Sequence, residues 1–492
     1  MKKRFVIAML AVASLAQAQV DSVLTDVRRE LWANMVVRHA DSRVDFTDLH
    51  TGCSASRRSR AALPEEGNER NLFAVRTSAL RHLGRPGIVS AMAEYDNYRI
   101  RNRVWNETSD YGVVAPYCAG DSIVGDLSGE TYRFSGAYST TVGQRWMLGA
   151  EIRYRSALEF SRSDPRPRNV ISDMFLKLAA GRRFGGRMAA ASVGVRLYSQ
   201  KSDIDFYSDA GSMSIFHMTG LGSDYQRFAG DKYNSNFQGT GWQMSLEWLK
   251  PQSGGLQASM RVEGIAIEKI LPSINYLTLC KVDRLDAGLT LGLVSSADDC
   301  FRAVNLEAGL KRRKGTENIF GAGSGGNYPK ISSLRGYEST DARAALTAVE
   351  TMRPTGWLKL KVAPAVAYWF GREEHKQVER EIENSSARLS FDLGADAALG
   401  LVRLMLDVDG ECSRNLRSRW SAAGLQKQSS RLEAFEARAA YLSDDCLSLA
   451  GRLRTECHLA ASKLYLDMSF ALIKYDECGL SKHGGVALGC VF

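Results

Sequence analysis

The stretch QRWMLGAEIRYR, residues 144–155, indicates the fold because its side chains alternate in character at every second position. One set is apolar or aromatic: Trp146, Leu148, Ala150, Ile152 and Tyr154. The other set is largely small or charged: Met147, Gly149, Glu151, Arg153 and Arg155. Successive side chains of a β-strand point to opposite faces of its sheet. An apolar face of about ten residues with an aromatic residue at each end is typical of a strand that faces lipid between two interfacial girdles.

The same alternation returns along most of the chain. It is clearest in GWQMSLEWLK (241–250), LQASMRVEG (256–264), WLKLKVAPAVAYWF (357–370) and ARLSFDLGADA (387–397). The second face of these stretches carries too many charges for the dry interior of a sandwich. A soluble β-solenoid or a set of sandwiches is the competing architecture, but no fixed repeat is visible and a sandwich needs no aromatic girdles. We therefore expect an all-β chain folded as a transmembrane antiparallel β-barrel.

Turn signals separate these strands unevenly. Short turns are expected at 84–87, 143–144, 185–186, 252–255, 352–355 and 399–400. Long polar loops are expected at 50–71, 99–129, 160–169, 200–238, 313–337, 371–384 and 411–429. Short periplasmic turns and long extracellular loops are typical of outer-membrane barrels. Reversing direction at each turn gives about 18 strands, within a range of about 14–18, and an even number places both chain ends in the periplasm.

The N-terminus, MKKRFVIAMLAVASLAQAQ, has the features of a secretory signal peptide. Positive residues precede an apolar stretch that is too short to span a bilayer, and small residues follow at the cleavage site. Cleavage after Ala18 makes residues 1–18 the signal peptide. Residues 19–40 look partly helical, and we interpret them as an N-terminal periplasmic segment or a short insert in the lumen. The barrel then comprises residues 41–492, and the expected location is the outer membrane.

The chain ends on GGVALGCVF, residues 484–492, which again alternates. The expected lipid face of this last strand consists of Val486, Leu488, Cys490 and Phe492. The last strand must pair with the first, because an unpaired strand edge is not tolerated in lipid. The terminal Phe492 resembles the terminal phenylalanine by which the barrel-assembly machinery reads outer-membrane barrels as a group.

Composition excludes several functions. The formal charge of +9 comes without a long basic run, so we exclude nucleic acid as a partner. No H-E-x-x-H or C-x-x-C motif occurs, and we expect no metal and no cofactor. Nine cysteines are an odd number, so at least one stays unpaired in the monomer. Cys446 and Cys457 suggest either a disulfide near one turn or, with neighbouring Asp and His residues, a metal site.

Four longer stretches are distinctive: WNETSDYGVVAPY (105–117), GDLSGETYRFSGAY (125–138), DPRPRN (164–169) and RKGTENIFG (313–321). They resemble an uncharacterised Bacteroidota outer-membrane β-barrel family, domain of unknown function 6850. The resemblance runs from about residue 40 to the end of the chain, and the nine cysteines depart from a typical member. It implies the barrel fold and the outer membrane, but no catalytic or binding residue, because the family has no established activity.

Charged residues on the inward face are candidates for contact with a solute in the lumen: Arg153, Arg155, Arg261, Glu263, Arg388 and Asp392. Two interpretations remain open. The charges form a polar conduit whose field selects solutes, or a ladder of cross-strand ion pairs that holds the wall together. Charges of both signs nearly cancel a steering field, which favours the ladder.

The loop segment 105–117 holds further candidates: Trp105, Glu107, Asp110 and Tyr111. Aromatic side chains are costly to expose, so this loop is expected either to fold into the lumen or to meet a partner. In DPRPRN, Arg166 and Arg168 are candidates to grip an anion, although a rigid structural turn is favoured. The basic run 311–314 is expected where a strand reaches the cell surface, as a solvated rim or as a site for lipopolysaccharide phosphates or an acidic partner.

The leading hypothesis is an outer-membrane barrel that serves transport, as a passive conduit or as an accessory to a TonB-dependent uptake system. A structural or interaction barrel with a plugged lumen is the runner-up. A barrel-embedded hydrolase using Ser212, Ser214 and His217 comes third, and we do not expect an enzyme. No globular plug precedes the strands, so the chain is not expected to be a TonB-dependent receptor itself. Expected partners are outer-membrane lipid and lipopolysaccharide, the assembly machinery, and a TonB-dependent receptor or surface lipoprotein.

Overall fold

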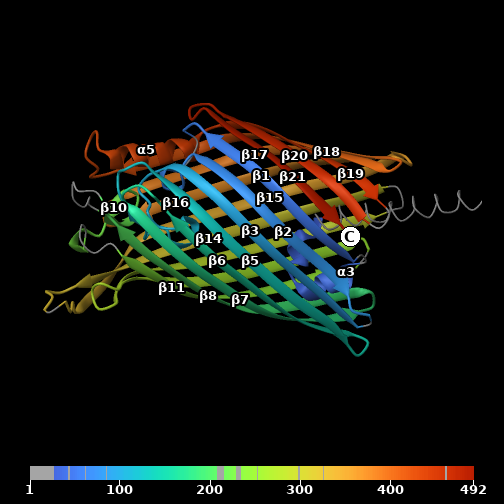
Figure 1. Cartoon of the computed structure of the whole chain (residues 1–492), viewed down its shortest axis with the longest axis horizontal. Coiled ribbons are helices and arrows are strands. Elements are labelled where there is room, and N and C mark those ends of the chain that lie inside the picture. The colour runs from blue at the N-terminus through green and yellow to red at the C-terminus, as the bar shows by residue number, and fades with distance from the viewer. Residues whose placement is uncertain are drawn as a thin grey trace, which may run out of the picture.

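Eighteen strands form one closed antiparallel barrel in the computed structural model, which describes residues 27–42, 45–60, 63–84, 86–207, 215–228, 234–251, 253–296, 300–324, 326–459 and 462–492 (Figure 1). The predicted signal peptide lies outside these residues. The wall consists of β1 (Phe46–Arg58), β2 (Glu69–His82), β3 (Gly87–Arg103), β5 (Gly125–Val142), β6 (Trp146–Phe160), β7 (Arg166–Phe184), β8 (Arg187–Asp205), β11 (Ser235–Leu249), β12 (Gly255–Leu271), β13 (Leu277–Ser296), β14 (Cys300–Phe320), β15 (Lys330–Thr355), β16 (Leu358–His375), β17 (Arg380–Leu399), β18 (Val402–Ala422), β19 (Cys446–Leu459), β20 (Ser462–Tyr475) and β21 (Leu480–Val491). The predicted fold and the strand number are confirmed.

The barrel closes where its first and last strands meet. Strand β1 pairs with β2 on one side and with β21 on the other, and Thr51 lies opposite Leu488 in that register. At the end of the seam the amide of Phe492 donates to the carbonyl of Thr47 at 2.9 Å. The last strand therefore pairs with the first, as predicted, and this seam leaves no strand edge in lipid.

The outward face of the wall is apolar. Trp146, Leu148, Ile152, Met260 and Phe391 are each between 46% and 49% exposed, whereas Met147, beside Trp146 in the chain, is fully buried on the inner side. Exposure thus alternates from one residue to the next, with the same period of two as the apolar residues in the sequence. The apolar coat is where a membrane must contact the protein, because only a closed barrel satisfies its backbone hydrogen bonds in hydrocarbon. No helix among the described residues is long and apolar enough to cross a bilayer.

The two ends of the barrel differ in their connections. At one end the strands are joined by the short segments 83–86, 143–145, 185–186, 250–254, 297–299, 356–357, 400–401 and 460–461. At the other end several connections are long, above all 104–124, 206–234 and 423–445. Following the general pattern of such barrels, we call the first the periplasmic end and the second the external end.

Several predicted loop boundaries are wrong in the same way. The expected loop 50–71 contains most of β1, and the expected loop 313–337 is largely the paired ends of β14 and β15. The expected turn 352–355 is part of β15, which runs to Thr355. The basic run 311–314 accordingly lies within β14 and not at its end; Lys311 is in register with Asp286 and Asp341. Strands of this length continue past the hydrocarbon layer, where their outward side chains are polar and the apolar alternation stops.

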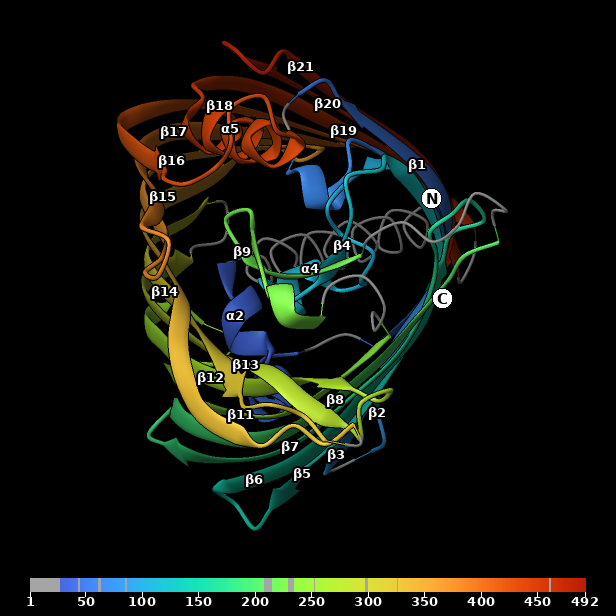
Figure 2. The same cartoon turned by 90° about the vertical axis from the view of Figure 1, so that its left-hand side faces the viewer.

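Segments of the chain also lie inside the barrel. Near the periplasmic end these are α2 (Arg29–Trp32) and α3 (Met35–Asp41). From the external end come η1 (Pro64–Glu66), α4 (Tyr111–Val114), β4 (Ala119–Gly120), β9 (Phe216–Gly220), β10 (Ser223–Asp224) and η2 (Gln226–Phe228). Strands β4, β9 and β10 form a small separate sheet. Helix α5 (Ser430–Ser443) covers part of the external end, and the view along the barrel shows α2, α4, β4 and β9 within the ring of strands (Figure 2).

Arginine placed on the two faces of β13 tests the assignment of outside and inside. Leu289→Arg puts a charge in the apolar coat, where about 2–4 kcal/mol of stability is lost near the bilayer midplane. Gly288→Arg is the matched control, because a side chain there points into open space with no atom within 4 Å of its Cβ. Urea unfolding in lipid vesicles measures both variants. Equal losses, or a greater loss for Gly288→Arg, would contradict the assignment.

Candidate functional site in the lumen

The first feature of the lumen is the N-terminal insert, which we define as residues 27–42. Helix α3 begins with Asn34, whose side-chain oxygen accepts a hydrogen bond from the amide of Val36 at 3.0 Å, an N-cap that satisfies one free donor. The apolar face of the insert packs on inward side chains near the periplasmic turns, in a cluster of Leu31, Met35, Val36, Val37, Ala40, Ala137, Met147, Ala179, Met188, Ala190 and Leu249. This packing fixes the insert against the wall of β5–β8 and β11.

Buried polar contacts hold the same insert in register. Arg28 and Asp41 form an ion pair at 2.6 Å, with 1% and 0% of their side chains exposed. Arg28 also donates to Gln257 Oε1 at 3.0 Å and to the carbonyl of Ser253 at 2.7 Å, while Trp32 donates to Asp41 at 2.8 Å. Each charge is therefore fully paired, which is the condition under which a buried ion pair is tolerated.

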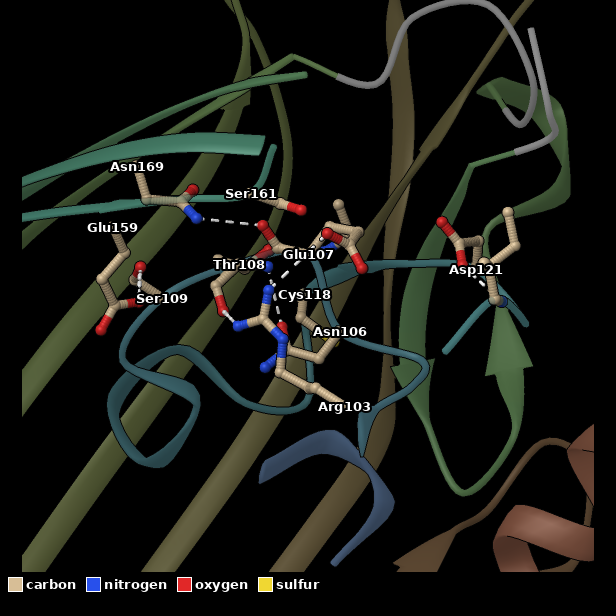
Figure 3. A network of polar contacts seen from close by, with 12 residues as sticks. Arg103, Asn106, Glu107, Thr108, Ser109, Cys118, Asp121, Glu159, Ser161 and Asn169 are labelled. Carbon is tan, nitrogen blue, oxygen red and sulfur yellow. Dashed lines mark hydrogen bonds and ion pairs between the residues drawn. The ribbon is translucent and has the colours of Figure 1, made fainter. Parts of the chain in front are cut away.

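The second feature is the external insert, which we define as residues 104–124. Trp105 is 5% exposed and Tyr117 1% exposed, so this loop folds into the lumen instead of lying on the surface. Its path is fixed by hydrogen bonds from the wall: Asn169 of β7 donates to the carbonyl of Glu107 at 3.1 Å (Figure 3). Within the insert, the amide of Ala119 donates to Thr108 Oγ1 at 2.8 Å. Of the two interpretations of this loop, the structure supports the lumen.

Asp110 joins the external insert to the charged wall. It accepts hydrogen bonds from Arg155 Nη1 at 2.8 Å and from the hydroxyl of Tyr198 at 3.1 Å. Arg155 also contacts Asp173 at 3.2 Å, and Asp173 in turn pairs with Arg196 at 2.8 Å. These charges form a continuous network across β6, β7 and β8, so here the ladder interpretation is the one that the structure supports.

Glu107 is an acid in a buried position. Its carboxylate lies 3.6 Å from the guanidinium of Arg103, and both side chains are almost completely covered (Figure 3). Burial raises the pKa of Glu107 to about 8; the neighbouring Asp121 acts in the same direction, and Arg103 acts against it. The loss of hydration thus outweighs the attraction of the arginine. Near neutral pH the side chain takes up a proton on folding, which couples the external insert to pH.

A cavity of about 1400 Å³ lies in the lumen beside these inserts. Glu30, Ala33 and Arg38 of the N-terminal insert line it from the periplasmic side, and Leu63, the N-cap of η1, and Glu66 of η1 line it from the external side. The wall between is made by inward residues of β5–β8 and β11–β18, with charges of both signs. A space of this size suits water and a polar solute, because charged side chains of both signs line it.

The structure separates the predicted binding residues into groups. Arg153, Arg155, Arg261, Glu263 and Arg388 line the cavity. These side chains already interact with other protein groups. Arg153 lies 3.2 Å from Glu151 and over the ring of Phe175, and Arg261 forms an ion pair with Glu30. Glu263 accepts a hydrogen bond from Gln243 at 3.2 Å, and Arg388 lies 3.5 Å from Glu411. Asp392 pairs with Lys361. Trp105, Glu107, Asp110 and Tyr111 belong to the external insert and do not line the cavity.

Arg166 and Arg168 are not brought to the cavity. Arg166 pairs with Asp164 at 2.8 Å and lies 4.3 Å from the ring centre of Tyr207, and Asp164 also accepts from the amide of Tyr207. Arg168 is exposed at the external end of β7. The contacts of Arg166 are those of a structural turn, the favoured interpretation.

Sequence reasoning missed other residues that line the lumen. Trp369, Asp341 and Arg343 sit on the inward face of β15 and β16, and the period of two in WLKLKVAPAVAYWF would have assigned Trp369 there. Arg28 and Asp41 gave no usable signal, because their pairing within the insert and the contact of Arg28 with the distant carbonyl of Ser253 depend on the folded chain.

The cysteines and histidines form no reactive site among the described residues. All nine cysteines are free. The disulfide considered between Cys446 and Cys457 is wrong, since the two lie towards opposite ends of β19, roughly 35 Å apart at about 3.3 Å per residue. No group of three His, Cys, Asp or Glu that could hold a metal occurs in the part of the chain that the structure describes. His217 is buried in β9, while Ser212 and Ser214 lie outside that part.

Comparison with known proteins identifies a family and a general fold. The model of DUF6850, a family of unknown function, matches residues 36–492; a Bacteroidota origin stays a prediction. Among curated proteins, none matches the sequence.

Solved barrels of similar architecture include three receptors or transporters. The ferric preacinetobactin receptor BauA of Acinetobacter baumannii has 8% identity and a TM-score of 0.39 over 92% of this chain and 80% of that one. A mutant of the ferric enterobactin receptor PfeA of Pseudomonas aeruginosa has 10% identity and a TM-score of 0.42 over 91% and 80%. The FrpB iron transporter of Neisseria meningitidis has 9% identity and a TM-score of 0.39 over 94% and 83%. Likeness at this level says nothing of function.

Breaking the buried ion pair tests how the N-terminal insert is held. Asp41→Ala leaves Arg28 buried without its carboxylate, at a cost of about 3–5 kcal/mol, so the amides of α3 should exchange hydrogen much faster. Glu30→Ala removes a partly exposed pair with Arg261 in the same insert and should cost no more than about 1 kcal/mol. Equal exchange rates of α3 in the two variants would show that the buried pair does not anchor it.

The raised pKa of Glu107 predicts a pH dependence with a definite sign. Because the acid is protonated in the folded insert, its contribution to stability is complete below the unfolded pKa of 4.5 and is lost as pH rises towards about 8. Local opening of residues 105–121 should therefore increase between pH 5 and pH 8, after correction for the intrinsic exchange rate. Glu107→Gln should remove most of this dependence. An unchanged slope in that variant would assign the pH dependence to another group.

Proposed function

We propose that this chain, which belongs to the DUF6850 family of unknown function, is an outer-membrane barrel that conducts small polar solutes through a lumen narrowed by its own inserts. The observation that carries the proposal is the charged cavity of about 1400 Å³ beside the inserts. A barrel that only stabilised the membrane or displayed loops would gain by filling this space with packed side chains, because every void forfeits contacts. A polar cavity between the two ends of a barrel is instead what a solute pathway requires.

The same proposal includes location and maturation. Residues 1–18 are removed as a signal peptide, residues 19–40 stay with the barrel as its N-terminal segment, and residues 41–492 form the barrel. The apolar coat supports insertion into the outer membrane among its lipids and lipopolysaccharide. The alternating last strand supports recognition of Phe492 by the barrel-assembly machinery. We propose no cofactor, no metal and no enzymatic activity.

Two modes of conduction are compatible with this pathway. In a passive conduit the inserts set the size limit. In an accessory role the barrel works beside a TonB-dependent receptor or a surface lipoprotein, and the inserts move when the partner binds. The buried anchoring of the N-terminal insert by Arg28 and Asp41 supports the passive mode, because a fixed insert narrows the lumen without closing it on demand.

A second candidate function is an interaction barrel, favoured by the folded cap at the external end. Phe435 and Ala439 of α5 pack on Leu221 and Ile382, and Arg438 pairs with Glu373 at 2.6 Å. An ordered cap of this kind presents a defined surface to a partner. It does not explain the polar cavity beneath, and we therefore rank it second.

Conductance in planar bilayers tests the conduit directly. The wild-type barrel should insert in discrete conductance steps, and Ala345→Trp should lower each step because Ala345 lines the cavity. Ala344→Trp is the matched control, since Ala344 lies on the outward face of the same strand, β15, and adds an aromatic ring only to the lipid side. A purified, folded barrel that stays silent would overturn the conduit. So would identical steps for the two tryptophan variants.

A further inference from the structure

We propose that the cavity wall formed by β14 and β15 is a binding site for zwitterions, molecules such as amino acids and short peptides that carry an ammonium and a carboxylate group. This inference rests on the proposed conduction of polar solutes and names the class of solute. It is carried by four charged side chains, two of each sign, that line the cavity and form no hydrogen bond or ion pair within 4.0 Å among the described residues.

Charges on the wall of β6–β8 are already paired with one another. On β6 and β7, Lys177 lies 2.9 Å from Glu151, which also lies 3.2 Å from Arg153. On β7 and β8, Asp173 is shared by Arg155 and Arg196. A charge that already has a partner at this distance gives up that interaction before it can bind a solute. The wall of β6–β8 is therefore a poor place for a charged ligand.

Charges on β14 and β15 behave differently. Glu307 and Lys311 of β14, with Asp341 and Arg343 of β15, line the cavity. Among the described residues, none of these four side chains makes a hydrogen bond, and none forms an ion pair within 4.0 Å. All four are at least partly exposed, with Lys311 and Arg343 the most open. Asp341 is attracted by Lys311 and Arg313 only over a longer distance. A solute of matching charge can therefore bind here without first breaking a hydrogen bond or a close ion pair.

Register brings the four into one patch of alternating sign. Lys311 lies directly opposite Asp341. Arg343 lies opposite Gly309, which is the inward position of β14 between Glu307 and Lys311. Directly opposed residues have Cβ atoms about 4.5–5.5 Å apart. Lys311 and Asp341 are thus neighbours on the wall, but no ion pair within 4.0 Å joins them, and both line the cavity.

Small residues make room above this patch. Gly309 lies beneath the side chain of Arg343, whose Nε is 3.1 Å from the position that a Cβ would take at Gly309. Ala345 and Ala367 are opposite each other on β15 and β16, and Trp369 is opposite Arg343. All of them line the cavity. The patch therefore combines charges that have no close ion-pair partner among the described residues with small side chains and one aromatic side chain, which suits a zwitterion with an apolar portion.

The balance of signs selects the zwitterion over an ion of one charge. A simple anion would be drawn to Lys311 and Arg343 and repelled by Glu307 and Asp341, and a simple cation would meet the reverse. A zwitterion can place its carboxylate near Lys311 and Arg343 and its ammonium near Glu307 and Asp341. The charge-assisted hydrogen bonds that it forms are the strong ones, while the net charge of the occupied patch remains unchanged.

The test compares three probes on the purified full-length barrel in detergent, by isothermal titration calorimetry: the dipeptide Gly-Phe, its N-acetylated form and its C-terminal amide. The dipeptide should bind about tenfold or more tightly than either singly charged form. In Arg343→Gln the preference for the dipeptide over its amide should vanish. In Glu307→Gln the preference over the acetylated form should vanish. Arg312→Gln is the control, because Arg312 lies on the outer face of β14 and pairs with Glu338.

Equal affinity for the three wild-type complexes, or tightest binding of the acetylated anion or of the amide, would overturn the zwitterion site without any variant. Variants count only if they keep the β-sheet spectrum of the wild type. Selective binding of the dipeptide by a barrel that shows no conductance would contradict the proposed conduction but support the zwitterion site. Conductance by a barrel that binds the three probes with equal affinity would contradict the zwitterion site but support the proposed conduction.

Discussion

The structure depends on one constraint: in hydrocarbon no backbone amide or carbonyl is left without a hydrogen bond. The seam between β1 and β21 meets it, because it removes the last free strand edges. Closure also divides the side chains, since each strand now has one face towards lipid and one towards the lumen. The apolar coat with Trp146 and Leu148 and the charged inner wall with Glu151 and Arg153 are two consequences of the same geometry.

Two inserts from the chain itself fill part of the lumen of this wide barrel. The N-terminal insert packs an apolar helix face near the periplasmic turns and ties it down with the buried pair of Arg28 and Asp41. The external insert buries Trp105 and Tyr117 and reaches the wall through Asp110. Where the inserts stop, a polar cavity remains. Wall charges that face it are paired on β6–β8, whereas Glu307, Lys311, Asp341 and Arg343 of β14 and β15 form no close ion pair among the described residues. This difference is the basis of the proposed specificity.

Much of the fold could be predicted from the sequence, and little of the site. The period of two in residues 144–155 marks both faces of a strand because the pattern is local, and repeated alternation led to the strand number. Loop boundaries were too wide where strands such as β15 continue beyond the lipid with polar outward side chains. Whether Arg155 or Arg343 has a partner depends on cross-strand register and on an insert from elsewhere in the chain, which no local pattern records. The same holds for Arg28 and Asp41.

The central claim is that neighbouring residues of one strand face hydrocarbon and water in turn. Spin labels placed singly at residues 341–347 of β15, in a variant without native cysteines, test it most directly in lipid vesicles. The account predicts that even-numbered positions are accessible to dissolved oxygen and odd-numbered positions to a water-soluble nickel chelate, with a period of two. Uniform accessibility along the segment, or the reverse assignment of odd and even positions, would contradict it.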